Sequence, residues 1–431
     1  MEMIELKSKI CIVGLGYIGL PTAAVLADKG FTVHGVDVNE EAVRLINNGQ
    51  VHIYEPDLEK VVKKVVTAGK LTADIEPIKA DIYILAVPTP FKEKHKPDMA
   101  YVESATKSII PYIEPGNLII LESTSPIGTT EKMAEWILNE RPDLSMDERK
   151  SNQIFISHCP ERVLPGKILK ELIENDRTVG GINKMSTQKT AEFYESFVEG
   201  EVLQTNAKTA ELTKLTENTY RDVNIAFANE LSMICDDQEI DVWELIRLAN
   251  HHPRVDILQP GPGVGGHCIA VDPWFIVDAA PERAQLIYTA RNVNDSKPNF
   301  VIDKIKEAAT DPAHSKIACL GLAFKANIDD LRESPALEIV KDLAEMLPST
   351  IYVVEPHISE LPSVLRNKNI ELINTEDAIA NADILVILVD HDYFKAIDKN
   401  SIKEKHIIDT RGLYTKSEPY DNAATEKYLT V

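Results

Sequence analysis

The sequence predicts an α/β protein with two Rossmann-like, doubly wound domains joined by a central helical domain that contains one long helix. Strand-like apolar runs alternate with helical stretches at both ends of the chain, which is typical of parallel sheets covered by helices on both faces. The strands near the C-terminus repeat the pattern of those near the N-terminus. Between the two ends, residues 209–237 have apolar side chains at helical spacing and no internal proline or glycine.

The N-terminal elements begin with a buried strand over 9–14, and a helix over 21–29 follows it. Three further strands are expected over 32–38, 81–87 and 117–121. Each of these runs is short and rich in Ile, Val and Leu, as expected for a strand buried on both faces. This alternation predicts a nucleotide-binding type of sheet over residues 1–205.

The C-terminal elements repeat this order, with strands expected over 316–321, 351–355 and 382–389. Their first turn reads Gly321-Leu322-Ala323 and lacks a second glycine, so we expect this unit to bind a different nucleotide. The long helix then serves as a spine between two domains. The predicted domains are an N-terminal Rossmann domain, a central helical dimerisation domain and a C-terminal Rossmann-like domain, over 1–205, 206–305 and 306–431.

Composition limits the class of protein. The 431 residues include 46 Lys and Arg against 68 Asp and Glu, a net charge of −22. Such an acidic chain disfavours nucleic-acid and membrane partners, and any anionic substrate must be held by local cations. Five cysteines without metal-ligand spacing indicate a reducing compartment, and the N-terminus enters a strand directly. We therefore expect a cytoplasmic protein with no metal.

A dinucleotide fingerprint opens the chain. Gly14, Gly16 and Gly19 follow the first strand and start a helix, and Asp37 ends the second strand. In this context the glycines let backbone N–H groups approach a pyrophosphate, while the acidic residue accepts hydrogen bonds from ribose hydroxyls. The pattern predicts NAD rather than NADP, and its alternative is a tight turn between strand and helix.

Cys268 lies in a second glycine-rich run over 261–272. Glycines and a histidine surround it, whereas Cys11 and Cys319 lie in apolar strand-like runs and are expected to be core residues. A thiolate can trap an aldehyde as a thiohemiacetal, which can then lose a second hydride. Together with a nicotinamide cofactor, this cysteine suggests covalent redox chemistry.

Several polar residues are candidates for binding anions. Lys214, Asn218 and Arg221 share one face of the long helix, although a solvated polar stripe has the same spacing. His251 and His252 lack a third ligand at metal spacing, which leaves Arg254 as a diphosphate candidate or a surface ion pair. The segment 323–335 contains two further cations that could bind phosphate, Lys325 and Arg332. The alternative is that this segment is a charged cap of the next helix.

Seven motifs in order make the chain resemble the UDP-glucose/GDP-mannose dehydrogenase family along essentially its whole length. They are GLGYIGLPTA at 14–23, VPTP at 87–90, ESTSPIGTT at 122–130, SHCPERVLPG at 157–166, AELTKLTENTYRDVNIAFANE at 210–230, GPGVGGHCIAVDPWFI at 261–276 and GLAFKANIDDLRESP at 321–335. The resemblance implies the four-electron oxidation of a sugar C6 alcohol to a carboxylate with NAD. It also implies a homodimer, or a dimer of dimers, built on the long helix.

The resemblance assigns roles residue by residue. Cys268 is implied as the nucleophile, Asp272 as the acidic partner that helps to deprotonate alcohol or water, and Lys214 as the group that stabilises the oxyanion. Asn218 is its hydrogen-bonding companion, Thr124 positions a water, and Glu161 serves thioester hydrolysis. The implied cofactor-binding residues are Gly14, Gly16, Tyr17, Ile18, Gly19, Asp37, Thr89, Thr124 and Arg332. The implied substrate-binding residues are Arg162, Val163, Lys214, Asn218, Arg221, His252, Arg254, Gly265, Phe324, Lys325 and Arg411.

Departures from the family pattern bear on the substrate. Pro165 stands where UDP-glucose enzymes often carry a second glutamate, and Ala42 stands where some relatives carry an arginine. Their Ser-Cys-Phe-Pro-Lys-Asp run is replaced by residues 267–272, which gain His267 and lose a lysine. The resemblance therefore favours an N-acetylated sugar, UDP-N-acetyl-D-mannosamine, with UDP-N-acetylglucosamine or UDP-glucose as alternatives.

Two other classes of protein share part of this pattern. A two-electron hydroxy-acid or 6-phosphogluconate-type dehydrogenase also has a Rossmann domain followed by long helices. It has no use for Cys268 or for a second Rossmann-like domain. A regulatory protein that binds a nucleotide sugar without catalysis is disfavoured by the joint presence of Lys214, Asn218, Cys268 and Asp272.

Overall fold

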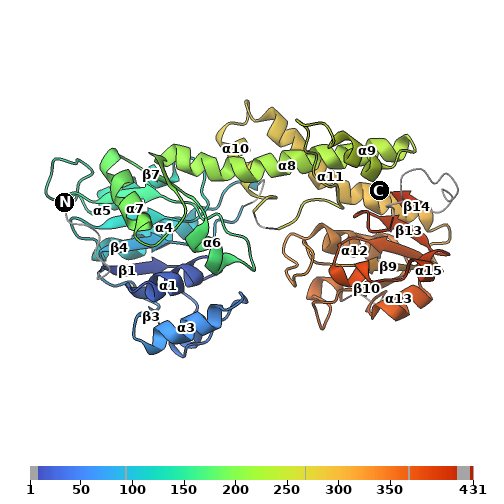
Figure 1. Ribbon diagram of the computed structural model, residues 1–431, viewed down its shortest axis with the longest axis horizontal. Coiled ribbons are helices and arrows are strands. Elements are labelled where there is room, and N and C mark those ends of the chain that lie inside the picture. Colours follow the sequence, from blue (N-terminus) through green and yellow to red (C-terminus); the bar gives the residue numbers. More distant parts are fainter. Residues whose placement is uncertain (1–7, 93–94, 267, 367–368, 415–427, 431) are drawn as a thin grey trace. The chain divides into compact units, whose positions relative to one another are not determined.

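The computed structural model describes residues 8–92, 95–266, 268–366, 369–414 and 428–430 (Figure 1). The chain divides into two compact units. The first unit comprises Met1–Glu217 and Trp274–Ala280, and the second comprises Asn218–Pro273 and Pro281–Val431. Each unit contains a parallel-type sheet of Rossmann order, so the predicted fold class is confirmed. The finer division into three domains stays a prediction.

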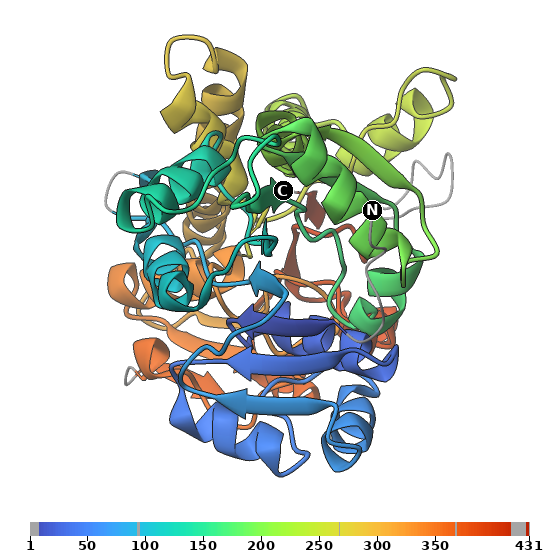
Figure 2. The same cartoon turned by 90° about the vertical axis from the view of Figure 1, so that its left-hand side faces the viewer.

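The first unit is built on an eight-stranded sheet in the order β3-β2-β1-β4-β5-β6-β7-β8. The direction of the order changes between β1 and β4, so the loops after these strands form the switch-point crevice where such sheets bind nucleotides. One pairing departs from the predicted parallel sheet, because β6 and β7 run antiparallel. Figure 2 shows the parallel blue strands side by side. The strands are β1 (Lys9–Val13), β2 (Thr32–Val36), β3 (Leu71–Asp74), β4 (Ile82–Leu85), β5 (Leu118–Leu121), β6 (Phe155–His158), β7 (Arg177–Gly181) and β8 (Val202–Asn206).

Two helices of the first unit begin after a residue whose side chain caps their first N–H groups. Asn39 caps α2 and Asn183 caps α7, each through its side-chain oxygen. The first helix begins at Gly19, two residues before its predicted start, since Pro21 is tolerated within a first turn that has no need of its N–H. The helices are α1 (Gly19–Asp28), α2 (Glu40–Asn47), α3 (Leu58–Thr67), α4 (Ala100–Ile109), η2 (Ile110–Tyr112), α5 (Thr129–Glu140), α6 (Ile168–Glu174) and α7 (Lys184–Glu195).

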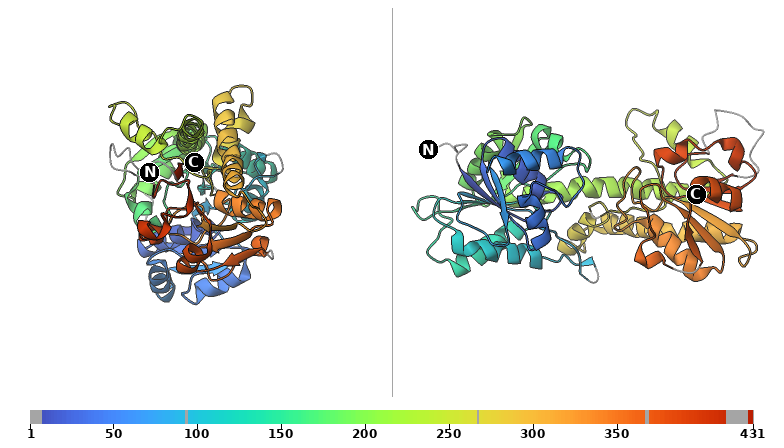
Figure 3. Two further views of the ribbon diagram at one scale, coloured as in Figure 1. Left: turned by 90° about the vertical axis from the view of Figure 1, so that its right-hand side faces the viewer. Right: turned by 90° about the horizontal axis from the view of Figure 1, so that it is seen from below.

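The second unit holds a six-stranded parallel sheet in the order β11-β10-β9-β12-β13-β14. Its switch point lies between β9 and β12, and Figure 3 shows its orange and red strands. The strands are β9 (Lys316–Leu320), β10 (Thr350–Val354), β11 (Ile370–Leu372), β12 (Ile384–Ile387), β13 (His406–Asp409) and β14 (Tyr428–Thr430). Ser334 caps the helix that begins at Pro335, as the Ser-Pro pair predicts.

The long helix α8 (Ala207–Asp237) is one unbroken element, as the apolar periodicity predicts (Figure 1). Its last twenty residues belong to the second unit, where they form a buried polar seam with α11 (Gln285–Ala308). The other helices are α9 (Val242–Ala249), α10 (Asp272–Ala279), α12 (Pro335–Met346), η3 (Ser363–Leu365), α13 (Thr375–Asn381), α14 (Asp392–Lys395) and α15 (Lys399–Ile402).

The seam encloses a lysine that a core would ordinarily exclude. Lys297 on α11 is fully buried, its Nζ donates to Ser232 Oγ at 2.7 Å, and it lies 4.5 Å from the centre of the Phe300 ring. Burial lowers the pKa of Lys297 to about 7, and the charge of Asp236 only partly opposes this. The folded chain therefore favours the neutral amine, whereas the unfolded chain keeps the ordinary, higher pKa.

Lys297→Met is expected to stabilise the protein at neutral pH. Between pH 7 and the ordinary lysine pKa, the unfolded wild-type chain binds more protons, so its stability rises with pH across this window. Lys297→Met removes this pH dependence, and its free energy of unfolding at pH 7 should be roughly 1–4 kcal/mol higher than that of the wild-type chain. Thermal unfolding at pH 7 to 9.5 measures it, with exposed Lys306→Met on the same helix as the control. An unchanged pH slope in Lys297→Met would contradict this account.

Candidate active site

The turn between β1 and α1 has the shape of a pyrophosphate cradle. Gly14 has a φ of +94°, and a Cβ on Gly19 would lie 1.8 Å from the Gly14 carbonyl oxygen, so neither position admits a side chain. At Gly16, by contrast, a Cβ would have no neighbouring atom within 4 Å, so the space beside this residue is open. No side chain caps the first turn of α1, which begins after Tyr17 and Ile18. This open N-terminus fits a dinucleotide phosphate.

Asp37 joins the glycine turn to the end of β2. Its Oδ2 accepts from the Leu15 N–H at 2.8 Å, and its Oδ1 accepts from the Asn39 N–H at 2.9 Å. The carboxylate is only half-buried, and each oxygen keeps a lone pair for a ribose hydroxyl. Thr89, also half-buried, follows β4 on the other side of the switch point. The residues present therefore fit NAD.

Asp37→Asn should weaken the preference for NAD over NADP. The amide cannot repel a 2′-phosphate, and it loses a charge-assisted hydrogen bond worth about 1.5–3 kcal/mol. We expect the ratio of kcat/KM for the two cofactors to fall roughly 10- to 100-fold. Asp74→Asn, at the end of the neighbouring strand β3, provides an exposed control. Equal ratios in Asp37→Asn and the wild-type enzyme would remove Asp37 from the ribose site.

Cys268 is the one exposed cysteine in the described chain, and the other four are buried. Burial raises the pKa of the Cys11 thiol to about 11 and that of Cys319 to about 12, which makes both inert core residues, as predicted. Cys268 lies in the turn that leads into α10, where its carbonyl oxygen accepts from the Asp272 N–H at 2.9 Å. The turn thus exposes this thiol next to a helix start.

Asp272 and Asn218 meet although 54 residues separate them. The Asn218 side-chain amide on α8 donates to Asp272 Oδ2 at 2.5 Å, and both side chains are buried. Since Asp272 is also bonded to the Cys268 carbonyl, one network joins the thiol turn to the long helix. Lys214 lies one helical turn before Asn218 and is half-buried. Arg221, three residues after Asn218, is exposed.

A pocket opens at the switch point of the second sheet, beyond the ends of β9 and β12. Arg411 lies at its rim, where Nε and Nη2 bond to Asp390 Oδ1 at 2.9 and 2.7 Å. A Cβ on Gly261 would lie 2.6 Å from Arg411 Nη1, so the glycine makes room for the guanidinium. The lining residues are Pro262, Gly263, Ala323, Phe324, Lys325, Pro335, Ala336, Leu388, Val389, Asp390 and Arg411.

The thiol-bearing loop forms part of this pocket. Pro262 and Gly263 line it, and a Cβ on Gly265 would lie 2.8 Å from Phe324 Cβ and 2.5 Å from the Glu333 carbonyl oxygen. Close packing of the loop on segment 323–335 therefore requires glycine at 265. The structure brings together two motifs that lie more than fifty residues apart in the sequence. Arg332 in that segment bonds to Asp330 through its guanidinium.

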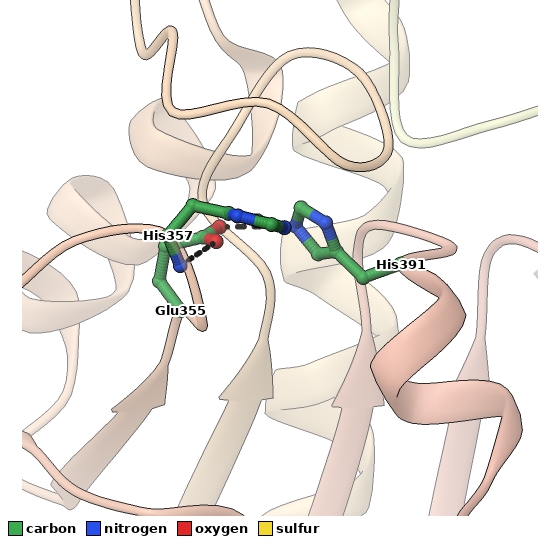
Figure 4. Close-up of side chains that lie close together, drawn as sticks. All are labelled: Glu355, His357 and His391. Atoms are coloured by element: carbon green, nitrogen blue, oxygen red, sulfur yellow. Dashed lines mark hydrogen bonds and ion pairs between the residues drawn. The ribbon is translucent and has the colours of Figure 1, made fainter.

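Glu355 directly follows β10, as Asp37 directly follows β2. Figure 4 shows the Glu355 side chain beside His357 and His391. Its Oε2 accepts from the Leu322 and Ala323 N–H groups at 2.7 and 3.1 Å, and Oε1 accepts from the His357 N–H at 3.1 Å. Burial raises the pKa of Glu355, but the hydrogen bonds from His391 and Leu322 outweigh it and the net pKa is lowered. Glu355 is buried and its Oε2 accepts three hydrogen bonds from protein groups, whereas Asp37 is half-buried and accepts one at each oxygen.

Glu355, His357 and His391 also lie close enough to suggest a metal site (Figure 4). His391 Nδ1 accepts from the Asn327 N–H at 2.9 Å, so the neutral ring carries its proton on Nε2, which lies 3.1 Å from Glu355 Oε2. That nitrogen donates to the carboxylate and has no lone pair for a metal. The cluster is therefore a hydrogen-bonded support for the turn after β9.

Glu161 and Thr124 lie in the first unit, after β6 and β5. Glu161 is buried, with Oε1 accepting from the Arg162 N–H at 2.8 Å and Oε2 paired with Arg177 at 2.5 Å. Thr124 is half-buried, and so are Arg162 and Val163. The Arg162 guanidinium pairs with Glu217 on α8 at 3.0 Å. These contacts hold the loop that follows β6.

The remaining predicted residues lie elsewhere. His252 and Arg254 occupy an exposed loop after α9, outside the lining of the pocket, and the Arg254 N–H donates to His252 Nδ1 at 3.3 Å. His267 lies outside the described residues. Sequence reasoning missed Asp390, although it follows a strand that repeats the N-terminal pattern. It also missed the Arg177–Glu161 and His391–Glu355 contacts, because neither Arg177 nor His391 belongs to a recognisable sequence motif.

Both units, then, carry nucleotide sites at their switch points, and one of them borders an exposed thiol. The chain belongs to the UDP-glucose/GDP-mannose dehydrogenase family: its NAD-binding domain matches residues 8–198, its central domain 208–296 and its UDP-binding domain 318–416. The chain is thus an NAD-dependent enzyme that oxidises a UDP-sugar. None of the helices in the described ranges combines the length and apolarity that a bilayer span requires.

Relatives of this chain share more than half of its residues. The UDP-N-acetyl-D-mannosamine dehydrogenase of Escherichia coli (strain K12) is 56% identical over 415 residues, covering 94% of this chain and 99% of that protein. The NDP-N-acetyl-D-galactosaminuronic acid dehydrogenase of Ralstonia nicotianae is 55% identical over 408 residues, covering 94% and 96%. Among solved structures, the UDP-N-acetyl-mannosamine dehydrogenase of Staphylococcus aureus is 40% identical, with a TM-score of 0.84 and 95% and 96% coverage.

Proposed function

We propose that this enzyme oxidises the C6 alcohol of UDP-N-acetyl-D-mannosamine to UDP-N-acetyl-D-mannosaminuronate through a covalent intermediate on Cys268. The observation that carries the proposal is that Pro262 and Gly263 line the pocket of the second unit, while Cys268, a few residues further along the chain, is exposed. A nucleotide held by Lys325 and Arg411 would thus have its sugar on the same loop as a nucleophile. This arrangement suits an enzyme that traps its own aldehyde product.

The first oxidation requires loss of a proton from the C6 hydroxyl and of a hydride from C6. NAD, when bound, would accept this hydride, and a second NAD molecule would accept the hydride lost in the second oxidation. Asp272, oriented by the Asn218 amide, is placed to accept the hydroxyl proton. Lys214 stabilises the developing negative charge on oxygen. The Cys268 sulfur then attacks the aldehyde carbon, and the resulting thiohemiacetal loses a second hydride to become a thioester.

Hydrolysis completes the reaction. A water oxygen bonds to the thioester carbon while the carbon–sulfur bond breaks, and the sulfur leaves as the Cys268 thiolate. The water loses both protons, and the acyl group departs as a carboxylate. Thr124 positions this water and Glu161 serves the hydrolysis. Pro165 removes the second carboxylate of some relatives, so Glu161 acts in this loop without it.

The sugar is proposed from two kinds of support. Loss of a lysine from the cysteine motif favours an N-acetylated sugar over glucose, and the relatives named for N-acetyl-mannosamine are up to 56% identical. A second candidate is the N-acetylgalactosamine sugar, because relatives named for its uronic acid are 55% identical. Each is a C2 acetamido sugar, so the two candidates differ in stereochemistry and share the chemistry at C6.

A side-by-side assay tests this proposal. UDP-N-acetylmannosamine, UDP-N-acetylgalactosamine, UDP-N-acetylglucosamine and UDP-glucose are each supplied with NAD, and the NADH formed is divided by the sugar consumed. We expect the highest kcat/KM with the mannosamine sugar and two NADH for each sugar. A ratio of one would indicate a two-electron dehydrogenase. Preference for the galactosamine sugar would replace the substrate but keep the mechanism.

We also propose that the enzyme is a homodimer built on α8. Tyr220, Phe227 and Ile234 recur at seven-residue intervals on this helix and are 65%, 51% and 50% exposed. An apolar stripe of this spacing on a long helix suits pairing with a second copy. Light scattering at micromolar concentration should give twice the chain mass, and a monomeric mass would rule the dimer out.

Arg254 is expected to serve the active site of the neighbouring subunit. Arg254→Ala should raise the KM for the UDP-sugar strongly, since the exposed loop at 251–256 has no place in the pocket of its own unit. Mixing Arg254→Ala chains with Cys268→Ser chains should then restore activity in the heterodimer. Each variant mixed with itself is the control. If no activity returns, both residues act within one chain.

A further inference from the structure

The antiparallel strand β7 places a buried arginine opposite Glu161. The register pairs Ser157 with Gly181 and His158 with Gly180. Extending this register past the end of β6 sets Glu161 against Arg177, the first residue of β7. A parallel strand at this position would have brought its other end to this edge of the sheet. The antiparallel direction of β7 therefore places Arg177 beside the residues that follow β6.

The Arg177–Glu161 pair is sealed from solvent. The two side chains are 2% and 6% exposed, and Arg177 Nη1 lies 2.5 Å from Glu161 Oε2. Arg177 Nη2 also donates to the Leu172 carbonyl oxygen at 2.8 Å. Because the other Glu161 oxygen accepts from the Arg162 N–H, the carboxylate is held at both oxygens. Such a pair is costly to bury, which calls for a role beyond stability.

A second buried carboxyl belongs to the same cluster. Glu122 directly follows β5, and Tyr194 on α7 donates its hydroxyl to Glu122 Oε1 at 2.6 Å. The Arg177 guanidinium lies 5.4 Å from the centre of the Tyr194 ring, so the tyrosine touches both halves of the cluster. Glu122 Oε2 has no hydrogen-bond partner among the described residues, and Glu122 is 2% exposed.

The charges of the cluster depend on one another. Burial and the negative charge of Glu161 raise the pKa of Glu122 to about 7, although Arg177 and Tyr194 oppose this. The positive charge of Arg177 thus attracts both carboxyl groups. While Glu122 is protonated, Arg177 interacts with Glu161 as its only negatively charged partner in this cluster. Ionising Glu122 would draw the guanidinium toward a second anion. The protonated state of Glu122 therefore keeps the guanidinium on Glu161.

Each carboxyl also holds a segment implicated in hydrolysis. Glu122 lies two residues before Thr124, in a turn fixed by the Ser123 hydroxyl on the Val87 carbonyl at 2.7 Å and by the Ser125 hydroxyl on the Ser123 carbonyl at 2.8 Å. Glu161 holds the loop that follows β6 through the Arg162 N–H. The buried cluster therefore connects the turn that contains Thr124 to the loop that contains Glu161.

We propose that Glu122, Arg177 and Tyr194 are positioning residues for the hydrolytic half of the reaction, fixing Thr124 and Glu161 relative to each other. The inference rests on the proposed thioester route. Thr124 and Glu161 serve water attack on the thioester carbon, in which the new carbon–oxygen bond forms as the carbon–sulfur bond breaks. In the first oxidation the proton goes to Asp272 and the developing negative charge is stabilised by Lys214, so at saturating NAD the first hydride loss does not depend on Thr124 or Glu161. Loosening the cluster therefore slows the second half-reaction selectively.

The test separates the two half-reactions in Glu122→Gln, Arg177→Met and Tyr194→Phe. Stopped-flow absorbance follows the first NADH formed, and intact mass spectrometry of quenched enzyme detects the sugar acyl group on Cys268. We expect an unchanged first step and hydrolysis slowed about 10- to 100-fold in Arg177→Met, as for a misplaced catalytic group. Acyl-enzyme should accumulate in all three variants, and Arg177→Lys should recover part of the rate.

Controls make each outcome decisive. Tyr83→Phe removes another buried hydroxyl of the same unit, one bonded to the Tyr112 carbonyl at 2.9 Å, and should leave hydrolysis unchanged. Tyr194→Phe removes a single oxygen and keeps the test open if Arg177→Met does not fold. The inference is overturned if Glu161→Gln accumulates acyl-enzyme and the three cluster variants do not. Absence of acyl-enzyme in every variant, Glu161→Gln included, would overturn the covalent route itself and this inference with it.

Discussion

Cys268→Ser should abolish formation of the uronate while leaving NAD binding intact. A serine hydroxyl is rarely ionised at neutral pH, and its ester would hydrolyse less readily than a thioester. We expect turnover to fall by a factor on the order of 10³ or more, as when other covalent nucleophiles are removed. The predicted NAD-binding residues do not include Cys268, so the dissociation constant for NAD should not change.

The matched control replaces a cysteine that chemistry does not use. Cys235→Ala alters a buried thiol on α8, in the same unit as Cys268. Burial raises its pKa, which keeps this thiol protonated and unreactive. Turnover should survive in this variant. Near wild-type oxidation by Cys268→Ser, measured as NADH formed with the UDP-sugar, would falsify the covalent scheme.

Arg411→Ala should raise the KM for the UDP-sugar by roughly 10-fold or more, because a charge-assisted hydrogen bond typically contributes about 1.5–3 kcal/mol. Two effects add here. The substrate diphosphate loses a cation at the pocket, and Asp390 loses the guanidinium that neutralises it. An unpaired carboxylate in the pocket would then repel the diphosphate directly, in a protein that already carries −22.

The second effect can be tested separately. Asp390→Asn combined with Arg411→Ala removes the repelling charge, and it should recover part of the lost affinity relative to Arg411→Ala. Arg366→Ala provides the control, since this arginine is 62% exposed and pairs with Glu360 in the same unit. Steady-state kinetics over a range of UDP-sugar concentrations measures all three. If Arg411→Ala has the KM of the control, Arg411 does not bind the diphosphate.

Short-range patterns predicted the fold class, which the structure confirms, and two nucleotide sites, which stay predictions. The spacing of Gly14, Gly16 and Gly19 is local, because all three lie in the turn between one strand and the helix that follows it. The apolar periodicity of α8 likewise depends on residues a few positions apart. Because such patterns are set by backbone geometry over a few residues, they can be recognised before any tertiary contact is known.

Only the tertiary structure decided which distant residues meet. The Asn218–Asp272, Arg411–Asp390 and Glu355–His391 contacts each join segments between 21 and 54 residues apart, and no spacing rule relates their members. The antiparallel direction of β7 was equally absent from the sequence pattern, since the residues of a buried strand do not show in which direction it runs. That direction places Arg177 beside Glu161. Strand order and direction are set by how whole layers pack, so the buried cluster that supports the candidate site could be found only in the folded chain.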